Sequence, residues 1–360
     1  MIRVLHCADL HLDTPVSTTG GGELLRGVLL ALDNRIAEAQ IQLVLMAGDI
    51  FDGTTVTRNT VHLLRHLFEN HSQTRFFIAA GNHDPYTEDS VYATQSWPSN
   101  VNIFTKDVLE RVYVEELDCD VYGASFTGNV ARSDLLEGFT PVNSERLNFM
   151  VLHGEVGGGE YRSITEKQLS LCGMDYVALG HIHAQSGIRL AGKTAYAWPG
   201  CPQGRGFDEC GEKGVYEGTV GKGKAEMHFM PLASKRYEIV RIPADGVTSN
   251  AELAARCRQL AQPDADVFMR FQLVGHVPMG LEINSSFLKE ECEGFAELEI
   301  VDDTALEVEW ESLKEERSLR GAFVQRLLPL LQSEDERTRR VAQMALRAGL
   351  SALEGEKVTL

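Results

Sequence analysis

Five short hydrophobic runs, each followed within a few residues by metal-binding side chains, constrain this chain more than any other feature. The runs are Ile2–Leu5, Leu43–Ala47, Phe76–Ala80, Phe149–Leu152 and Tyr176–Leu179. Short, nearly continuous hydrophobic runs are typical of strands that are covered on both faces. Open α/β sheets bind ligands beyond the carboxyl ends of their strands. We therefore expect an α/β fold in which the polar side chains after these runs meet at one edge of a sheet.

The polar side chains form five blocks: Asp9-Leu10-His11, Gly48-Asp49, Gly81-Asn82-His83-Asp84, His153-Gly154 and Gly180-His181-Ile182-His183. Seven of these residues offer an oxygen or an imidazole nitrogen to a metal, namely Asp9, His11, Asp49, Asn82, His153, His181 and His183. A single Asp-x-His or His-x-His arises often by chance, whereas five blocks in order at strand ends favour a two-metal phosphoesterase site. The alternative is that they are scattered turn and capping residues.

Two divalent ions divide these ligands in the expected site. Asp9, His11 and His183 are expected to hold the first ion. Asn82, His153 and His181 are expected to hold the second. The Asp49 carboxylate is expected to bridge the ions, which then lie ~3.5–4 Å apart. Such a pair can hold a bridging water as hydroxide near neutral pH and grip two phosphate oxygens, which supports in-line attack. Oxygen and imidazole ligands without thiolate suit Mn²⁺ or Fe²⁺, with Zn²⁺ as an alternative.

His83 directly follows the expected ligand Asn82 and is not itself needed as a ligand. We expect its imidazole to face the scissile phosphate and to stabilise or protonate the leaving oxygen, because histidine titrates near neutral pH. Asp84 is expected either to orient the His83 ring or to cap a helix that begins at Pro85. The prediction is that His83 and Asp84 act in catalysis, with capping as the alternative for Asp84.

Three further residues are candidates for substrate binding. Tyr161 and Arg162 follow a glycine-rich segment after the fourth block, where a tyrosine can stack on a base and an arginine can contact a phosphate. A surface loop is the alternative for both. Arg205 also lies among glycines and is expected either to contact substrate or only to form a turn. Histidines outside the blocks, such as His6, are expected to be packing or surface residues.

Composition restricts the class of protein. Hydrophobic residues make up 43% of the 360 residues, and no run approaches the ~20 apolar residues of a membrane span. The first strand leaves no room for a cleavable signal, and the seven cysteines include no Cys-x-x-Cys pair, so we expect a cytoplasmic protein with reduced cysteines.

The formal net charge of −18 is opposite to the basic surface of most nucleic-acid-binding proteins. Two divalent ions with only two carboxylate ligands still leave the expected site net positive.

The composition changes near residue 236. Residues 1–235 contain every metal block, and residues 236–360 are predicted to form a small α/β cap or partner-docking domain. The segment from Arg236 to Trp310 has 15 acidic and 6 basic residues. A capping-box sequence, Ser249-Asn-Ala-Glu252, predicts a helix that ends at Gln262. Two final helices are expected over Leu319–Leu331 and Glu334–Leu353.

These blocks resemble the calcineurin-like metallophosphoesterases, and within that family the DNA-repair exonuclease branch of the SbcD and YhaO-like proteins. The sequences that carry the resemblance are Asp9-Leu-His11, Gly48-Asp-Ile-Phe-Asp52, Gly81-Asn-His-Asp84, His153 and Gly180-His-Ile-His183. The phosphoprotein phosphatase branch typically has an arginine shortly after the second block, where this chain has Phe51-Asp52-Gly53. A glycine-rich stretch from Trp198 to Gly214 is similar to the YhaO-type pattern. The resemblance covers about residues 1–235.

The resemblance implies a four-layer αββα sandwich and Mn²⁺-dependent nuclease activity on DNA. It also implies a homodimer and a partnership with an SMC-like ATPase that carries a long coiled coil. By position, the same seven residues are ligands and His83 is catalytic. The short, acidic C-terminal part departs from the family pattern.

Two questions stay open at the level of the sequence. A helix expected over Thr57–Asn70 has Val61, Leu64, Leu67 and Phe68 on one face. We expect a homodimer through the helix around Val61, Leu64 and Phe68 and neighbouring elements, although this face can equally pack inward. A DNA exonuclease or endonuclease is the leading function. A small-molecule phosphodiesterase or nucleotide phosphatase is the alternative that the acidic composition favours. A non-catalytic metal-binding scaffold is a further alternative, against which the complete blocks argue.

Overall fold

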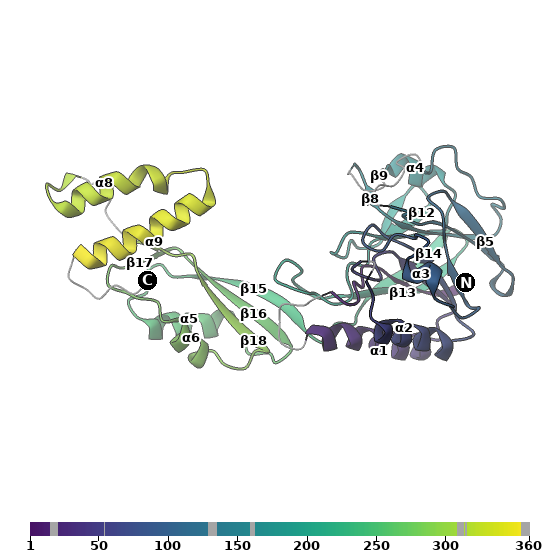
Figure 1. Cartoon of the computed structure of the whole chain (residues 1–360), viewed down its shortest axis with the longest axis horizontal. Helices are drawn as coiled ribbons and strands as arrows, with labels where there is room; N and C mark the ends of the chain where they lie inside the picture. Colours follow the sequence, from purple (N-terminus) through teal and green to yellow (C-terminus); the bar gives the residue numbers. More distant parts are fainter. Residues whose placement is uncertain are drawn as a thin grey trace. The chain divides into compact units, whose positions relative to one another are not determined.

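The structure is a computed structural model of the chain, and it describes residues 1–14, 21–53, 55–128, 135–158, 163–307, 313 and 315–353. Two compact units divide the chain, Met1–Tyr237 (unit 1) and Glu238–Leu360 (unit 2). Figure 1 shows the helices and strands of both units. Unit 1 contains all five blocks of predicted ligands.

Unit 1 contains two six-stranded sheets. The strands of the first sheet, in the spatial order β14, β13, β1, β2, β3 and β4, are Lys224–Pro231, Gly214–Gly221, Ile2–Cys7, Leu43–Ala47, Arg75–Ala79 and Val101–Ile103. Strands β1 to β4 are parallel neighbours, and β13 and β14 continue the sheet in antiparallel pairs. Because β1, β2 and β3 are parallel, the blocks that follow them lie at the same edge of this sheet.

The second sheet has the same design. Its strands, in the spatial order β11, β12, β10, β7, β6 and β5, are Arg189–Ala191, Thr194–Ala197, Tyr176–Gly180, Leu147–His153, Cys119–Ala124 and Glu110–Val114. The four central strands are parallel, and the edge strands β11 and β5 are antiparallel to their neighbours. The shorter elements of unit 1 are α3 (Val91–Thr94), a 3₁₀ turn (Glu115–Leu117), β8 (Glu155–Val156) and β9 (Ser163–Ile164).

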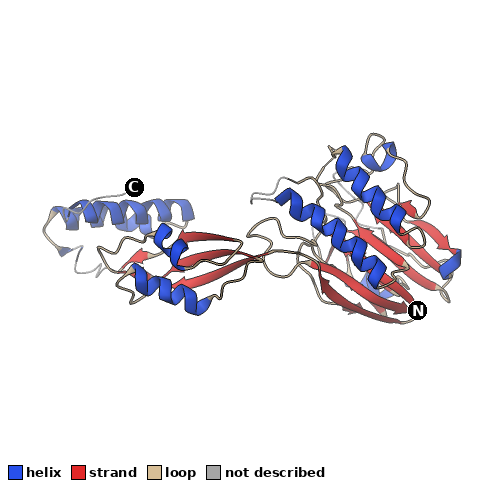
Figure 2. Cartoon of the chain, turned by 90° about the horizontal axis from the view of Figure 1, so that it is seen from below, coloured by secondary structure: helices blue, strands red, loops and turns tan. Residues whose placement is uncertain are grey.

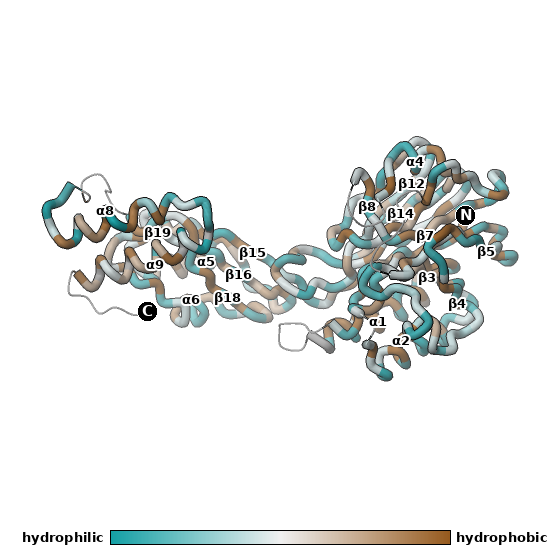
Figure 3. The backbone as a smooth tube through the Cα atoms, turned by 45° about the horizontal axis from the view of Figure 1, so that its top comes forward, coloured by the Kyte–Doolittle hydropathy of each residue, from teal (hydrophilic) through white to brown (hydrophobic). Residues whose placement is uncertain are grey.

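The two sheets pack face to face, and helices cover their outer faces. On β2, Leu45 points into the core between the sheets, whereas its neighbour Val44 packs under the helices α1 (Gly21–Glu38) and α2 (Arg58–Asn70). Figure 2 shows these two helices side by side across the sheet. Helix α4 (Glu166–Leu171) covers the second sheet, and Figure 3 shows how hydrophobic its inner strand β7 is. The predicted four-layer αββα sandwich is confirmed, and burial on both faces explains the continuous hydrophobic runs.

Helix α2 corrects one expectation. It begins after Thr57, whose side chain accepts a hydrogen bond from the backbone N–H of Thr60. Val61, Leu64 and Phe68 are buried against the first sheet of the same chain. The prediction that these three side chains form a dimer interface is therefore wrong, because the sheet already covers that face.

Unit 2 is a smaller α/β fold around a three-stranded sheet in the order β15, β16 and β18. Its elements are β15 (Arg236–Pro243), α5 (Asn250–Leu260), β16 (Val267–Val274), β17 (His276–Val277), α6 (Ser285–Glu291), β18 (Glu297–Asp302), β19 (Ala305–Leu306), α8 (Leu319–Leu331) and α9 (Glu336–Leu353). Phe271 and Leu273 of β16 pack with Leu253 of α5 and Leu288 of α6 in its core.

Local capping sets the helix ends in unit 2. Ser249 accepts from the backbone N–H of Glu252, so α5 begins where the capping-box sequence predicted. Helix α9 begins two residues later than expected, because Asp335 accepts from the backbone N–H of Thr338. Among the described residues, no helix is long and apolar enough to cross a bilayer.

Candidate metal centre

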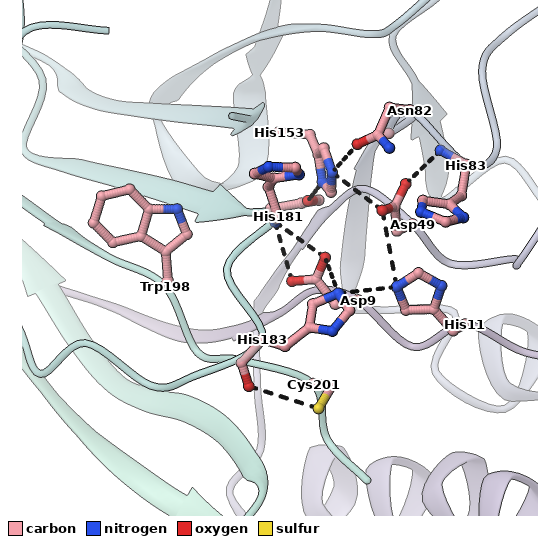
Figure 4. Close-up of polar contacts among 12 residues, drawn as sticks. Asp9, His11, Asp49, Asn82, His83, His153, His181, His183, Trp198 and Cys201 are labelled. Atoms are coloured by element: carbon pink, nitrogen blue, oxygen red, sulfur yellow. Dashed lines mark hydrogen bonds and ion pairs between the residues drawn. The ribbon is translucent and has the colours of Figure 1, made fainter. Parts of the chain in front are cut away.

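All seven predicted ligands and His83 lie together at the carboxyl ends of the unit 1 strands (Figure 4). The first sheet contributes Asp9, His11, Asp49, Asn82 and His83, and the second sheet contributes His153, His181 and His183. Strand β2 contacts both β7 and β10 across the sandwich. The ligand-bearing ends of the two sheets therefore meet at one place.

The backbone at several of these residues is left-handed. The angle φ is 53° at Asp9, 44° at His11, 50° at Asp49 and 96° at His181. Such angles disfavour a residue other than glycine by about 1–3 kcal/mol, and strain of this kind gathers at functional sites. The backbone N–H of Asp9 donates a hydrogen bond to the Gly48 carbonyl oxygen at 3.0 Å, and that of His11 donates to the Asp49 carbonyl oxygen at 2.9 Å. These hydrogen bonds stabilise the turns. Position 48 must be glycine, because φ is 86° and a Cβ there would collide with the His153 ring.

The first group of ligand atoms belongs to Asp9, His11 and His183, and these atoms lie within 4.8 Å of one another. The Nε2 atoms of His11 and His183 are 3.2 Å apart. Nδ1 of His11 donates to Asp52 Oδ1 at 2.9 Å, and Nδ1 of His183 donates to Glu209 Oε1 at 2.7 Å. Because a carboxylate can only accept, each ring carries its proton on Nδ1 and turns the lone pair of Nε2 inward.

The second group is built around His153. Its Nδ1 donates to the carbonyl oxygen of Ala47 at 2.8 Å, so its Nε2 also faces inward. This Nε2 lies 3.0 Å from Asn82 Oδ1 and 3.2 Å from Asp49 Oδ2. The same Asp49 oxygen is 3.8 Å from His11 Nε2. Asp49 therefore lies between the two groups, where a bridging ligand is expected.

The lone pairs of these groups fit two cations. Nε2 of His11 faces Nε2 of His183, and Nε2 of His153 faces two oxygens, so each group needs a proton or a cation between its atoms. Buried acceptors without a cation or donor are unfavourable. Burial by itself lowers the pKa of His153, but the carboxylates of Asp49 and Asp9 and the bond to the Ala47 carbonyl oxygen together outweigh burial and raise this pKa to about 9. The pocket thus attracts positive charge, and its oxygen and imidazole donors suit the predicted divalent ions.

His83 lies beside the first group without entering it. Its side chain is 48% exposed, and its ring meets the His11 ring edge-on with centroids 5.0 Å apart. Nδ1 of His83 is 3.4 Å from Asp52 Oδ1, and its backbone N–H donates to Asp49 Oδ1 at 2.9 Å. This imidazole is within reach of solvent and of the ligand cluster, so it can contact a substrate phosphate.

The prediction that Asp84 orients His83 is wrong. Its buried carboxylate accepts hydrogen bonds from the Tyr92 hydroxyl and from the backbone N–H groups of Asp49, Ile50, Phe51 and Gly81. The capping alternative is also wrong, because residues 85–90 are not helical and the next helix is α3. Asp84 instead holds the turn that carries Asp49, and the carboxylate beside His83 belongs to Asp52.

Of the predicted substrate contacts, the structure describes one. Arg205 lies next to His183, where its Nη2 donates to Glu209 Oε1 at 2.6 Å and its Nη1 is 3.8 Å from Asp52 Oδ1. Its side chain is 18% exposed. Arg205 therefore pairs with acidic residues of the centre. Tyr161 and Arg162 lie outside the described residues.

Three acidic residues without a predicted role contact the site histidines. Asp52 contacts His11, and Glu209 contacts His183, as described above. Glu155 Oε1 lies 3.2 Å from Nε2 of His181, so a metal held by His181 would meet Nδ1. Asp52 and Glu155 closely follow the predicted ligands Asp49 and His153 in the sequence. This spacing could have identified them as residues of the site. All three are far in sequence from the histidines they contact, and Glu209 does not closely follow a predicted ligand, so only the fold identifies it.

Comparisons with known proteins agree with this geometry. Residues 2–185 match the family described as Calcineurin-like phosphoesterase. A protein of Bacillus subtilis (strain 168) named "Uncharacterized metallophosphoesterase YhaO" is 28% identical over 247 residues, which are 63% of this chain and 60% of that protein. The match thus spans less than two thirds of that relative's length.

Two solved structures are similar at low sequence identity. The protein TT1561 of Thermus thermophilus is 12% identical, with a TM-score of 0.41 over 64% of this chain and 99% of that one. GAP50, the anchor in the inner membrane complex of Plasmodium, is also 12% identical, with a TM-score of 0.37 over 79% of this chain and 98% of that one. Both scores are too low to support an inference about this chain.

Proposed function

The chain belongs to the calcineurin-like phosphoesterase family, and we propose that it is a DNA-repair nuclease that cleaves phosphodiester bonds of DNA. Family membership makes the chain a metal-dependent phosphoesterase. DNA as the substrate and Mn²⁺ as the metal are the finer parts of the proposal. They are supported by the resemblance of the five blocks to the exonuclease branch, and by Phe51-Asp52-Gly53 where the phosphatase branch has an arginine.

The observation that carries the proposal is a half-exposed imidazole beside the seven predicted ligands, of which Asp9, His11, Asp49 and His153 are buried. Asp49 and His153 are buried, whereas the side chain of His83 is 48% exposed. Its ring nitrogen lies within 4.8 Å of ligand atoms of His11 and Asp52, and it is the most exposed imidazole of the cluster. A site that only stored metal would have no use for such a group. A site that cleaves a P–O bond needs one to meet the leaving oxygen.

The residues of the chain divide the work. The metal ions, when bound, activate water and neutralise charge on the phosphate. Asp9, His11 and His183 would hold one ion, and Asn82, His153 and His181 would hold the other, with Asp49 between them. Asp52 faces Nδ1 of His83 and orients its ring. With Nδ1–H turned to Asp52, a protonated His83 donates its second proton, on Nε2, to the leaving oxygen and is left as the neutral ring.

A small-molecule phosphodiesterase or nucleotide phosphatase is the second candidate. The formal net charge of −18 favours it, because a long polyanion is repelled by acidic surface outside the site while a small substrate meets only the site. A non-catalytic metal-binding scaffold is the third candidate, and the position of His83 argues against it.

A digestion panel tests the proposal. The full chain with Mn²⁺ is given single-stranded DNA, double-stranded DNA and a generic aryl phosphodiester, with the Asp49→Ala variant as control. We expect the chain to degrade DNA and the variant to leave it intact. Hydrolysis of the aryl phosphodiester alone would favour the second candidate. No hydrolysis of any substrate, with metal bound, would favour the scaffold.

Partner proteins belong to the proposal as well. Helices α8 and α9 expose Leu330, Val341 and Met344 beside a groove that Arg337 helps to line. We propose that an SMC-like ATPase covers this surface with helices of its coiled coil. Val341→Glu should then abolish co-purification with that ATPase.

A homodimer is also proposed, through a surface other than the buried face of α2. Light scattering at tens of micromolar tests whether the protein is dimeric.

A further inference from the structure

One loop surrounds His183. It runs from Gly200 to Lys213, and four of its residues contact His183 although they lie 18 to 30 positions away: Cys201, Arg205, Glu209 and Lys213. The side chain of His183 is 31% exposed, whereas that of His11 is 1% exposed. The position of His183 therefore depends more on specific contacts than that of His11 does. We call residues 200–213 the His183 loop.

The loop holds the backbone of His183. Nζ of the buried Lys213 donates to the His183 carbonyl oxygen at 2.9 Å. The backbone N–H of Cys201 donates to the same oxygen at 3.4 Å, and its Sγ lies 3.6 Å away, as Figure 4 shows. Gly200 allows this approach, because φ is 78° and a Cβ there would lie 2.7 Å from the carbonyl oxygen. Donors from both ends of the loop therefore fix the peptide of His183.

The loop also holds the ring of His183. Glu209 is 5% exposed and accepts from Nδ1 at 2.7 Å. Arg205 in turn holds Glu209. The backbone N–H of Arg205 donates to Glu209 Oε2 at 2.8 Å, and its Nη2 donates to Glu209 Oε1 at 2.6 Å. Both carboxylate oxygens are engaged, so Glu209 cannot rotate away without breaking bonds to Arg205. The ring is thereby set with Nε2 towards Asp9 and His11.

A competing explanation of this cluster is a further metal site. His183, Cys201 and Glu209 each offer a ligand atom within 4.8 Å of the others. The guanidinium of Arg205 already brings a positive charge to this place, 3.2 Å from Nδ1 of His183 and 2.6 Å from Glu209. A metal ion there would meet that charge at close range. The arrangement therefore suits positioning of His183 and disfavours binding of another ion.

We propose that the His183 loop positions His183 and so sets the affinity of the ion held by Asp9, His11 and His183, independently of the second ion. This inference rests on the ligand assignment in the proposed function. The second ion has its own support, because Glu155 contacts His181 and no described contact links Glu155 to the loop. Each of the two ions thus has a ligand histidine that a different acidic residue supports.

Metal titration tests the inference. Glu209→Ala should weaken one Mn²⁺ by about 10- to 100-fold, the usual effect of removing the partner of a ligand histidine. The other Mn²⁺ should bind as before, and paramagnetic resonance should change from a coupled pair to a single ion at limiting metal. Glu209→Gln keeps an oxygen that accepts from Nδ1 and should recover part of the loss. Arg205→Gln should weaken the same ion by a smaller factor.

Double variants identify which ion is affected. In a His183→Ala background, Glu209→Ala should cause no further loss, whereas Glu155→Ala should still weaken the ion that remains. Unfolding in the presence of chelator checks that each variant folds, and Glu209→Gln and Arg205→Gln carry the test if Glu209→Ala does not.

Three results would overturn the inference. Unchanged affinities in the Glu209 and Arg205 variants would remove the role of the loop. An equal loss of both ions, or a further loss in the His183→Ala background, would make the loop a general structural support. If the unaltered chain binds fewer than two ions, or His183→Ala binds both as tightly, the ligand assignment fails and the loop inference fails with it.

Discussion

The carboxylate of Asp84 accepts a hydrogen bond from the backbone N–H of Ile50, with Oδ2 2.7 Å from the nitrogen. This bond ties the turn after β3 to the turn after β2, and these two turns carry Asn82 and Asp49. A side chain that is not a predicted ligand therefore sets the distance between two predicted ligands.

Asp84→Asn should destabilise the protein and weaken metal binding. The amide nitrogen of asparagine would face backbone N–H groups that now have an acceptor, and each buried donor left without one is unfavourable by about 1–3 kcal/mol. We expect a loss of about 3 kcal/mol in the free energy of unfolding, measured in urea with chelator present. Tyr92→Phe removes a single hydroxyl donor from the same carboxylate and should lower stability by only about 1 kcal/mol. Equal effects of the two changes would contradict this role.

Asp49→Ala should remove both metal binding and hydrolysis. Asp49 Oδ2 lies between His153 Nε2 and His11 Nε2, at 3.2 Å and 3.8 Å, so its loss affects both groups of ligands. Metal content after dialysis and phosphodiester hydrolysis are the two measurements. A variant with full metal content and full activity would show that the centre is elsewhere.

His83→Ala should keep both metals and slow phosphodiester cleavage by about 10²-fold or more, the scale of a lost general acid. The reason is the exposed position of its imidazole outside both ligand groups. Activity is compared with metal content in the same preparation. Loss of metal together with activity would make His83 a structural residue.

His6 should make stability depend on pH. It is buried between the sheets, with Nε2 3.1 Å from Leu179 O and Nδ1 2.9 Å from the Tyr176 hydroxyl. Burial lowers the pKa of His6 from 6.5 to about 3. The unfolded chain therefore binds this proton more readily than the folded one. The stability from neutral His6 is fully present above pH 6.5 and is lost as the pH falls from 6.5 towards about 3.

His6→Gln keeps a donor for Leu179 but cannot titrate. Between pH 6.5 and about pH 5, the unaltered chain should lose about 2 kcal/mol more stability than this variant. Urea unfolding at the two pH values, with chelator present, measures the difference, and other titrating groups cancel in the comparison. Parallel stability curves would mean that His6 does not contribute.

Deletion of residues 238–360 should show whether unit 2 guides DNA to the metal centre or supports hydrolysis in general. If unit 2 guides DNA, its removal should weaken cleavage of long duplex far more than hydrolysis of an aryl phosphodiester, because the predicted ligands all lie in unit 1. Both rates are measured on the same truncated protein. Equal loss on both substrates would mean that unit 2 only stabilises the fold, and no change on either would favour a partner-docking role.

The sequence by itself predicted the strands and the side chains that meet in the candidate site. Each ligand block stands at the end of a buried parallel strand or shortly after it, and parallel strands end at one edge, so local order along the chain is enough to bring Asp9 and Asn82 to the same edge of the first sheet. The packing of the second sheet on the first adds His181. The four-layer sandwich followed from the family resemblance, and burial of β2 on both faces explains its sequence.

Only the tertiary structure decided what the remaining side chains contact. The apolar face of α2 has the same pattern whether it meets a sheet or a second subunit, so its burial at Phe68 could not be predicted from periodicity. Asp84 contacts backbone amides of a turn 33 to 35 positions away, and Glu209 contacts His183 across 26 positions. These contacts depend on how separate loops pack at the strand ends, and no local spacing in the sequence encodes that packing.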